Sequence, residues 1–359
     1  MTETLHIKNT GPIKEVNLKI KKVTIFIGKN GTGKSITGKI LQLKRDEIFS
    51  NFYKNLKEEY QLQNYITPNS KIDFIPNENL KKASEILKQF TDNFEIKRYL
   101  EYSLIENKNL PQKAKENLKT IKEILEKEKE IKFSYYIPTE RNMVPFLSSY
   151  GINFLTAKIP LPQYILEFAS NFRLAKDMFK EIDVFEYKYK FENDEDRIYI
   201  DKNNFISLME ASSGIQALLP LKITIPYLNR VRKKDFILEE PELNLFPQEQ
   251  FELVKFMIEN SNSVLFISHS PYILVSLNIL LFAYQVGNIN YQTKKLVSKF
   301  IPQKYWINPD NFSGYCFDDG GVIDIAKNGL ISNNYLDDVN DELNNLFDEL
   351  LEIKVMNEK

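Results

Sequence analysis

The segment GKNGTGKS, residues 28–35, is the strongest indication of fold class in this sequence. It follows the apolar run KVTIFI (22–27), and the chain beyond it takes on a helical pattern. A strand, a glycine-rich loop and a helix in this order fit the pattern GxxxxGK[ST] of a phosphate-binding loop. Glycines let successive backbone N–H groups turn inward around phosphate oxygens, and the helix N-terminus adds partial positive charge. We therefore expect a nucleoside triphosphate here; the alternative is a glycine-rich turn that binds nothing.

The side chains of the loop are expected to have different roles in binding the triphosphate. Lys34 would reach the β and γ phosphates, and Ser35 would offer its hydroxyl to Mg²⁺. The residues that we expect to contact the triphosphate are Gly28, Asn30, Gly31, Thr32, Gly33, Lys34, Ser35 and Ile36.

Two adjacent acids end another apolar strand. The stretch DFILEEPELNLF (235–246) places Glu239 and Glu240 before a break at Pro241. Ligands of open α/β sheets bind at the carboxyl ends of the strands. Glu239 would hold Mg²⁺, and Glu240 would be the base that orients or deprotonates an attacking water. The alternative is a strand end whose acids simply face water.

A histidine ends a third apolar strand. In SVLFISHSP (263–271), His269 could hydrogen-bond the γ-phosphate or the attacking water. A half-buried histidine with an ordinary structural role is the alternative.

Bulk composition excludes several classes of protein. With Lys+Arg 48 against Asp+Glu 49 and a formal net charge of −1, the 359 residues carry no global basic field for nucleic acid. The single Cys316 and the polar start of the chain predict a cytoplasmic protein without a disulfide framework. The longest apolar stretch, 273–286, is too short to cross a bilayer, so we expect a buried helix and no membrane partner.

The order of these segments resembles ABC-type ATPase heads of the SMC and RecF class, especially the compact bacterial AAA-family ATPases related to OLD nucleases and phage-defence ATPases. LHIKNTGPIKEVNLKI followed by FIGKNGTGKS is similar to the opening of that class. ASSGIQALLPL (211–221) looks like its signature segment, FILEEPELNLFP its Walker B motif and D-loop, and FISHSPYIL its switch histidine. The resemblance implies an α/β P-loop NTPase fold, namely an ABC-type head with a mixed sheet, flanking helices and a helical insertion.

The same resemblance implies a site shared between two copies of the chain. Ser213 and Gly214 would bind the γ-phosphate of ATP held by a second protomer, so that a head-to-head homodimer encloses two Mg²⁺–ATP and hydrolyses them slowly. An ordinary serine-rich helix cap is the alternative for this segment. The sequence departs from the family at Ile215, Glu239 and Phe246, and YYIPTERN (135–142) offers Thr139, Glu140 and Arg141 in place of a Q-loop glutamine.

The predicted domain organisation is discontinuous. Residues 1–40 and 131–286 would form the ATPase core, with a signature lobe at about 142–220. Residues 41–130, rich in Lys, Glu and Asn, would form a helical insertion, clearest at 112–129. Residues 287–359 would add the hairpin YCFDDGGVIDI and an acidic helix, which packs on its own core or on a partner.

We expect a dimeric sensor or regulator of a separate effector, a nuclease or toxin, in antiphage defence, with assembly to a higher oligomer left open; the defence role comes from the resemblance alone. The tail shows no Toprim-like acid cluster and no His or Cys metal cluster, so a separate effector would supply any nuclease. One alternative is an SMC/RecF-like ATPase of DNA repair, for which DNA is the partner. The energy subunit of a membrane transporter and a small-molecule kinase are further alternatives. The basic run Arg230, Arg232, Lys233 and Lys234 is interpreted as a charged loop.

Overall fold

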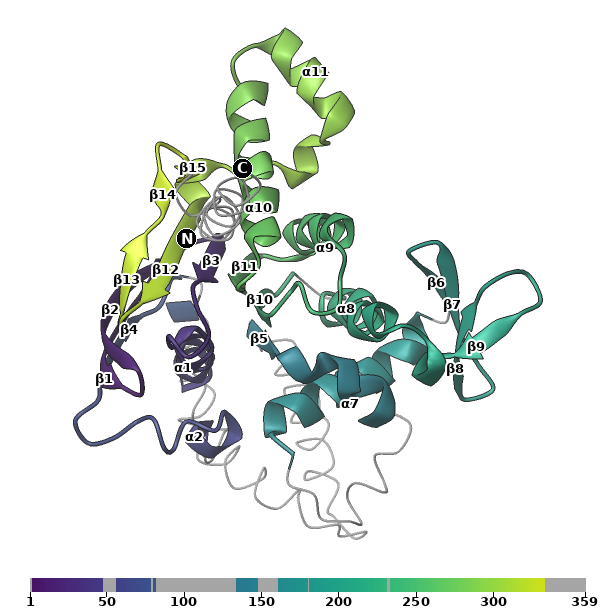
Figure 1. Ribbon diagram of the computed structural model, residues 1–359, viewed down its shortest axis with the longest axis horizontal. Helices are drawn as coiled ribbons and strands as arrows, with labels where there is room; N and C mark the ends of the chain where they lie inside the picture. Colours follow the sequence, from purple (N-terminus) through teal and green to yellow (C-terminus); the bar gives the residue numbers. More distant parts are fainter. Residues whose placement is uncertain are drawn as a thin grey trace, which may run out of the picture.

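The computed structural model describes residues 2–47, 56–78, 80–81, 134–147, 161–179, 181–230 and 233–332, and it shows a mixed α/β fold (Figure 1). The predicted α/β class, with a mixed central sheet and flanking helices, is confirmed.

A six-stranded sheet forms the centre, in the order β13-β12-β3-β11-β10-β5. Its strands are β3 (Val23–Ile27), β5 (Ser134–Ile137), β10 (Asp235–Glu239), β11 (Ser263–Ile267), β12 (Phe312–Asp318) and β13 (Gly321–Asp324). All neighbours pair in parallel except β12 and β13. Every residue of β3 and β10 is buried, as expected for continuous apolar strands covered on both faces.

Helices cover both faces of this sheet (Figure 1). Helix α1 (Lys34–Glu47) packs so tightly on one face that a Cβ at Gly38 would overlap the side chain of Ile267. Helices α9 (Pro247–Asn260) and α10 (Pro271–Gly287) lie on the other face. The buried helix predicted at 273–286 is present as α10, which is buried along one side, whereas Val275, Ile279 and Phe282 on its other side are exposed. The reason is that α10 extends past the sheet, with α11 (Tyr291–Phe300) folded back against it (Figure 1).

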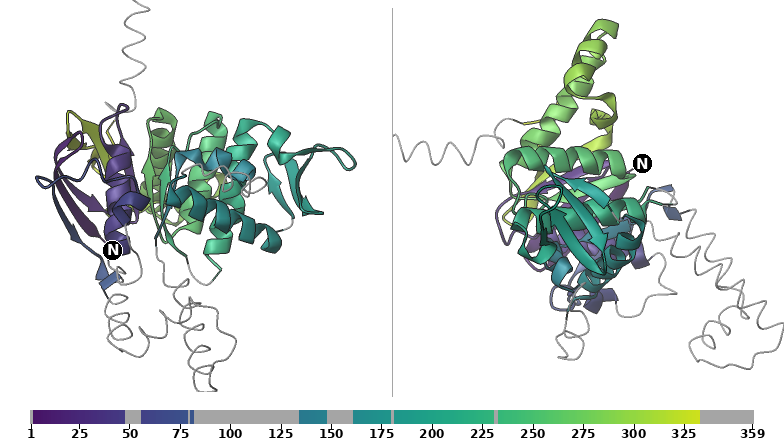
Figure 2. Two further views of the ribbon diagram at one scale, coloured as in Figure 1. Left: turned by 90° about the horizontal axis from the view of Figure 1, so that it is seen from below. Right: turned by 90° about the vertical axis from the view of Figure 1, so that its right-hand side faces the viewer.

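An antiparallel sheet stands beside the central one, in the order β2-β1-β4 (Figure 2). Its strands are β1 (Glu3–Thr10), β2 (Ile13–Ile20) and β4 (Lys71–Ile75). The prediction that 41–130 is helical is therefore wrong in part: 41–47 complete α1, α2 (Leu56–Glu59) is one short turn, and β4 pairs with β1. Ile72 and Phe74 alternate with polar residues and pack on the core, which favours a strand. The expected helix 112–129 lies outside the described residues.

A lobe extends from the β5 edge of the central sheet (Figure 1). Its elements are η1 (Thr139–Met143), α7 (Gln163–Met178), β6 (Glu181–Val184), β7 (Tyr187–Glu192), β8 (Glu195–Tyr199), β9 (Phe205–Ser207), η2 (Leu208–Glu210) and α8 (Ser213–Leu228). Strands β7 and β8 pair as an antiparallel hairpin within this lobe. Helix α8 packs against both α7 and η1.

The described part of the predicted C-terminal segment 287–359 contributes to the central sheet. The predicted hairpin exists as β12 and β13, but β12 pairs in parallel with β3 and so belongs to the central sheet. The remaining short elements are η3 (Gln303–Tyr305), η4 (Pro309–Asn311), β14 (Ala326–Lys327) and β15 (Leu330–Ile331). The predicted acidic helix lies outside the described residues.

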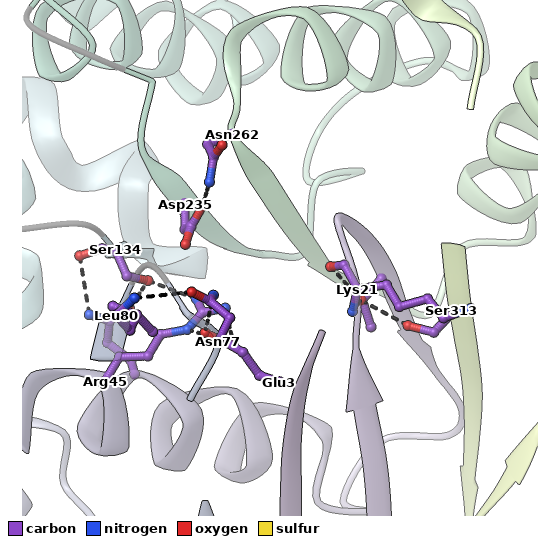
Figure 3. A network of polar contacts seen from close by, with 11 residues as sticks. Glu3, Lys21, Arg45, Asn77, Leu80, Ser134, Asp235, Asn262 and Ser313 are labelled. Atoms are coloured by element: carbon purple, nitrogen blue, oxygen red, sulfur yellow. Dashed lines mark hydrogen bonds and ion pairs between the residues drawn. The ribbon is translucent and has the colours of Figure 1, made fainter. Parts of the chain in front are cut away.

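A buried polar network joins elements at the end of the central sheet where β5 and β10 begin (Figure 3). Arg45 Nη2 lies 2.7 Å from Glu3 Oε2, and Arg45 Nη1 donates to Ser134 Oγ at 2.8 Å. Asn77 donates to the other oxygen of Glu3 at 2.9 Å. Because the carboxylate and the guanidinium satisfy each other, the end of α1 is fixed to β1 and β5.

Among the described helices, none combines the length and the apolar character needed to cross a bilayer.

Candidate functional site

The loop between β3 and α1 is a backbone cradle. Gly28, Gly31 and Gly33 have φ values of 139°, 80° and 101°, which favour glycine. A Cβ at Gly28 would overlap the carbonyl oxygen of Phe317, and one at Gly33 would crowd Ile13. At Gly31, by contrast, no atom lies within 4 Å of the position of a Cβ. The loop is therefore closed against the protein on one side and open at its tip.

Lys34 lies inside this cradle. Its Nζ donates to the carbonyl oxygens of Gly28 at 2.6 Å and Lys29 at 2.7 Å. Burial lowers the pKa of Lys34, while Cys316 and the carboxylates of Glu242, Glu240 and Glu239 act in the opposite direction. The ammonium group thus faces oxygen atoms in a polar enclosure, the kind of position from which it could bind phosphate oxygens.

The other loop residues are more open. Asn30 and Gly31 are exposed, and Thr32, Ser35 and Ile36 are half-buried. Thr32 Oγ1 donates to the carbonyl of Lys29 at 2.9 Å, which closes the turn from within.

Strand β10 delivers the two predicted acids to the same edge of the sheet. In the central sheet, β11 lies between β10 and β3. The loops that follow these three strands are therefore neighbours at the same edge of the sheet. Glu239 is buried and accepts a hydrogen bond from the hydroxyl of Tyr136. Glu240 is half-buried; burial raises its pKa, His269 acts against this, and Glu242 and Glu239 add to it.

A carboxylate that sequence reasoning missed lies between these groups. Oε1 of Glu242 accepts from Ser268 Oγ and from the His269 backbone N–H, both at 2.9 Å, and lies 3.3 Å from His269 Nδ1. Its Oε2 is buried with no hydrogen-bond partner in the described structure. The available signal was the position of Glu242 in EPEL, two residues after the predicted base.

His269 itself lies at the end of β11, with its side chain half exposed beside Glu242. The structure therefore brings Lys34, Glu240 and His269 together at one edge of the sheet.

Arg141 lies in the segment after β5, where the resemblance implies a Q-loop glutamine. The side chain is fully buried, and its guanidinium donates to the carbonyl oxygens of Glu239 at 2.7 Å and Glu240 at 2.6 Å. Sequence reasoning named Arg141 without assigning this contact, since nothing local marks an arginine as buried.

The predicted signature residues begin α8. Ser212, not Ser213, is the N-cap, and its hydroxyl accepts from the Ile215 N–H at 3.5 Å. Ser213 is the first helical residue and is exposed. A Cβ at Gly214 would come within 2.9 Å of the carbonyl oxygen of Asn244, so the start of α8 lies against the loop that follows β10. These two residues are thus carried by the lobe, whereas the phosphate loop is carried by the central sheet.

The residues present fit Mg²⁺ bound together with a triphosphate. In the described part of the chain, no group of three or more His, Cys, Asp or Glu side chains could hold a metal alone. The hydroxyl of Ser35 and the carboxylate of Glu239 are oxygen donors, and Mg²⁺ commonly takes only one or two protein ligands besides water and phosphate.

Comparison with known proteins adds a family and several solved structures. Residues 158–274, which include Glu240 and His269, match the AAA ATPase domain family. None of the curated proteins matches the sequence.

Similar solved structures include cbiO1 from Clostridium perfringens, part of the ABC transporter complex cbiONQ, at 13% identity, 90% and 88% coverage of this and that chain, and TM-score 0.35. The SMC head domain from Thermotoga maritima has 12% identity, 91% and 98% coverage, and TM-score 0.38. The Smc head domain of Pyrococcus furiosus, bound to the C-terminal domain of ScpA, has 11% identity, 98% and 99% coverage, and TM-score 0.35.

Proposed function

We propose that this chain is an ATPase of the AAA, ABC and SMC type that hydrolyses Mg²⁺–ATP slowly between two protomers and uses that cycle to regulate a separate effector protein. The match of residues 158–274 to the AAA ATPase domain family supports the resemblance to ATPase heads that the motif order indicates.

The observation that carries the proposal is the common sheet edge of the glycine loop, Glu240 and His269. Lys34 Nζ would exchange the carbonyls of Gly28 and Lys29 for phosphate oxygens. The Glu240 carboxylate would take a proton from the attacking water, and its raised pKa makes it a stronger base than an exposed glutamate.

The other groups would position the phosphate and the water. His269, held by Glu242, would donate to the γ-phosphate or to the water. Mg²⁺, held by Ser35 and Glu239, would neutralise phosphate charge.

The second protomer enters through α8. Because Ser212 caps the helix, the Ser213 hydroxyl is not needed as the cap, and it is exposed at a helix N-terminus. Such a terminus presents backbone N–H groups and partial positive charge to an anion. This supports Ser213 and Gly214 as ligands of a γ-phosphate held by another copy of the chain.

We propose that the effector is a nuclease or toxin in antiphage defence, and this part of the proposal rests on the motif resemblance alone. The DNA-repair alternative gains nothing from the described part of the basic run. Lys234 is buried, Lys233 donates to the carbonyl of Glu259, and Arg230 stacks on the ring of Tyr227. Lys233 and Arg230 thus contact other parts of the chain itself.

ATP turnover without any added acceptor, measured over a range of protein concentrations, tests the proposal. We expect phosphate release whose rate per subunit rises with concentration, because the site is completed by a second copy. A wild-type protein that releases no phosphate from Mg²⁺–ATP would overturn the proposed activity, and a rate per subunit independent of concentration would overturn the shared site. Tight, salt-dependent binding of duplex DNA would instead favour the repair alternative.

A further inference from the structure

Glu240 has an unusual backbone conformation for a residue with a side chain. Its φ is 43°, in the left-handed region, although it is not a glycine. Such a conformation costs free energy and persists only where the surrounding structure holds it. The contacts that hold the main chain of Glu240 therefore determine where its carboxylate lies.

One side chain supplies two of these contacts. Arg141 Nη1 donates to the carbonyl oxygen of Glu239 at 2.7 Å, and Nη2 donates to that of Glu240 at 2.6 Å. The Glu240 N–H donates to Ile267 on the neighbouring strand at 2.8 Å. The planar guanidinium thus bridges two successive peptide units, just where the chain leaves β10.

The burial of Arg141 indicates that this bridge is its main role. The side chain is 0% exposed, and the hydrogen bonds of its guanidinium to the described residues go to backbone carbonyls, the third being that of Pro138 at 3.3 Å. Burial lowers the pKa of Arg141 to about 10, so the group stays charged at neutral pH. Its Nε is buried with no partner in the described structure. A buried cation with an unsatisfied donor is costly to retain for packing alone.

The turn that carries Arg141 is itself fixed from two sides. It follows β5, which pairs in parallel with β10, and η1 packs against α8. The guanidinium is therefore presented to Glu239 and Glu240 from a rigid base, as precise positioning requires.

We propose that Arg141 is a positioning residue for hydrolysis: by bridging the carbonyls of Glu239 and Glu240, it places the Glu240 carboxylate where it can take a proton from the water that attacks ATP. This inference rests on the proposed function. It assigns to Arg141 no contact with nucleotide.

Arg141→Lys tests the bridge most directly. Lysine keeps the charge and most of the length, but its ammonium group lacks the planar fork that spans two carbonyls. We expect the single-turnover rate of ATP hydrolysis to fall by about tenfold to a hundredfold, the scale of a small misplacement of a reacting group. The affinity for a fluorescent non-hydrolysable ATP analogue with Mg²⁺ should stay within about threefold of wild type, because Arg141 is not part of the phosphate loop.

Arg141→Gln, which also removes the charge, should hydrolyse more slowly than Arg141→Lys, so that lysine partly rescues it. Arg197→Lys is the matched control, since Arg197 pairs with Glu195 on the small sheet of the lobe and should leave hydrolysis unchanged. Thermal melts of all variants show whether they fold.

A wild-type rate in Arg141→Lys would overturn the inference. So would a parallel loss of analogue binding, or failure of Arg141→Lys to fold, since either would make Arg141 a residue of the general scaffold. The proposed function fails separately, if the wild-type protein in the same assay releases no phosphate.

Discussion

Glu242 and His269 are joined by two contacts: the carboxylate Oε1 lies 3.3 Å from the imidazole Nδ1 and accepts the His269 backbone N–H at 2.9 Å. The carboxylate also accepts from Ser268, so the loop after β10 holds the loop after β11. One acid therefore fixes both the position and the ring orientation of the only histidine near the site in the described residues.

Glu242→Gln should slow hydrolysis while leaving nucleotide binding intact. The neutral amide can still accept the backbone hydrogen bond, but it removes the carboxylate charge that lies beside the imidazole ring and helps to orient it, so we expect the single-turnover rate to fall by at least about tenfold. Glu252→Gln is a control of equal chemistry, because Glu252 is exposed on α9 and pairs with Lys255 on the same helix. Hydrolysis by Glu242→Gln at the rate of the control would show that the contact with His269 has no catalytic role.

The glycines of the loop should respond differently to alanine. At Gly31 a Cβ meets open space, so Gly31→Ala should lower the free energy of unfolding only by the cost of a left-handed residue, about 1–2 kcal/mol. At Gly28 a Cβ would also overlap the backbone of Phe317, and the loss should be larger. Chemical denaturation measures both values.

Nucleotide affinity provides a second test of the Gly31→Ala variant. The open space at Gly31 lies on the free side of the cradle, where a phosphate would bind. We therefore expect Gly31→Ala to weaken binding of an ATP analogue even under conditions in which the variant is fully folded. Unchanged affinity in Gly31→Ala would mean that the open face of the loop is not the binding face.

Ser213→Arg should prevent two copies from closing. Ser213 is exposed on the lobe and remote from the phosphate loop in the sequence, so the substituted protein should bind an ATP analogue as wild type does but hydrolyse ATP at the low rate of a monomer. Ser212→Ala removes only the helix cap and should cost about 1 kcal/mol of stability without this effect. If Ser213→Arg forms dimers with ATP, the signature segment does not act across the interface.

The parts of the site that the sequence predicts well are those with local signals. The phosphate loop combines a buried strand, glycines at fixed spacing and a helix start, and the structure has all three around residues 28–35. Glu240 and His269 each follow an apolar run, and parallel strands place such residues at a common edge.

What the sequence could not predict depends on non-local contacts. Strand β12 joins the central sheet beside β3, and no periodicity in residues 312–318 specifies that partner. Strand β4 lies in a stretch whose Lys, Glu and Asn content led to the prediction of a helix. In the structure this segment is a strand because it pairs with β1. Arg141 gave no sign of burial, because charged residues are seldom buried unless a specific contact holds them, and its contact is with distant carbonyls.

The most direct measurement is the molar mass of Glu240→Gln in solution, by light scattering, with and without Mg²⁺–ATP. Removing the base should slow hydrolysis by at least about a hundredfold while leaving the loop and Ser213 untouched, so that closed complexes accumulate. We predict a mass near that of one chain without nucleotide and twice that mass with ATP. A variant that binds ATP and stays monomeric, or one that still hydrolyses it at the wild-type rate, would contradict the account.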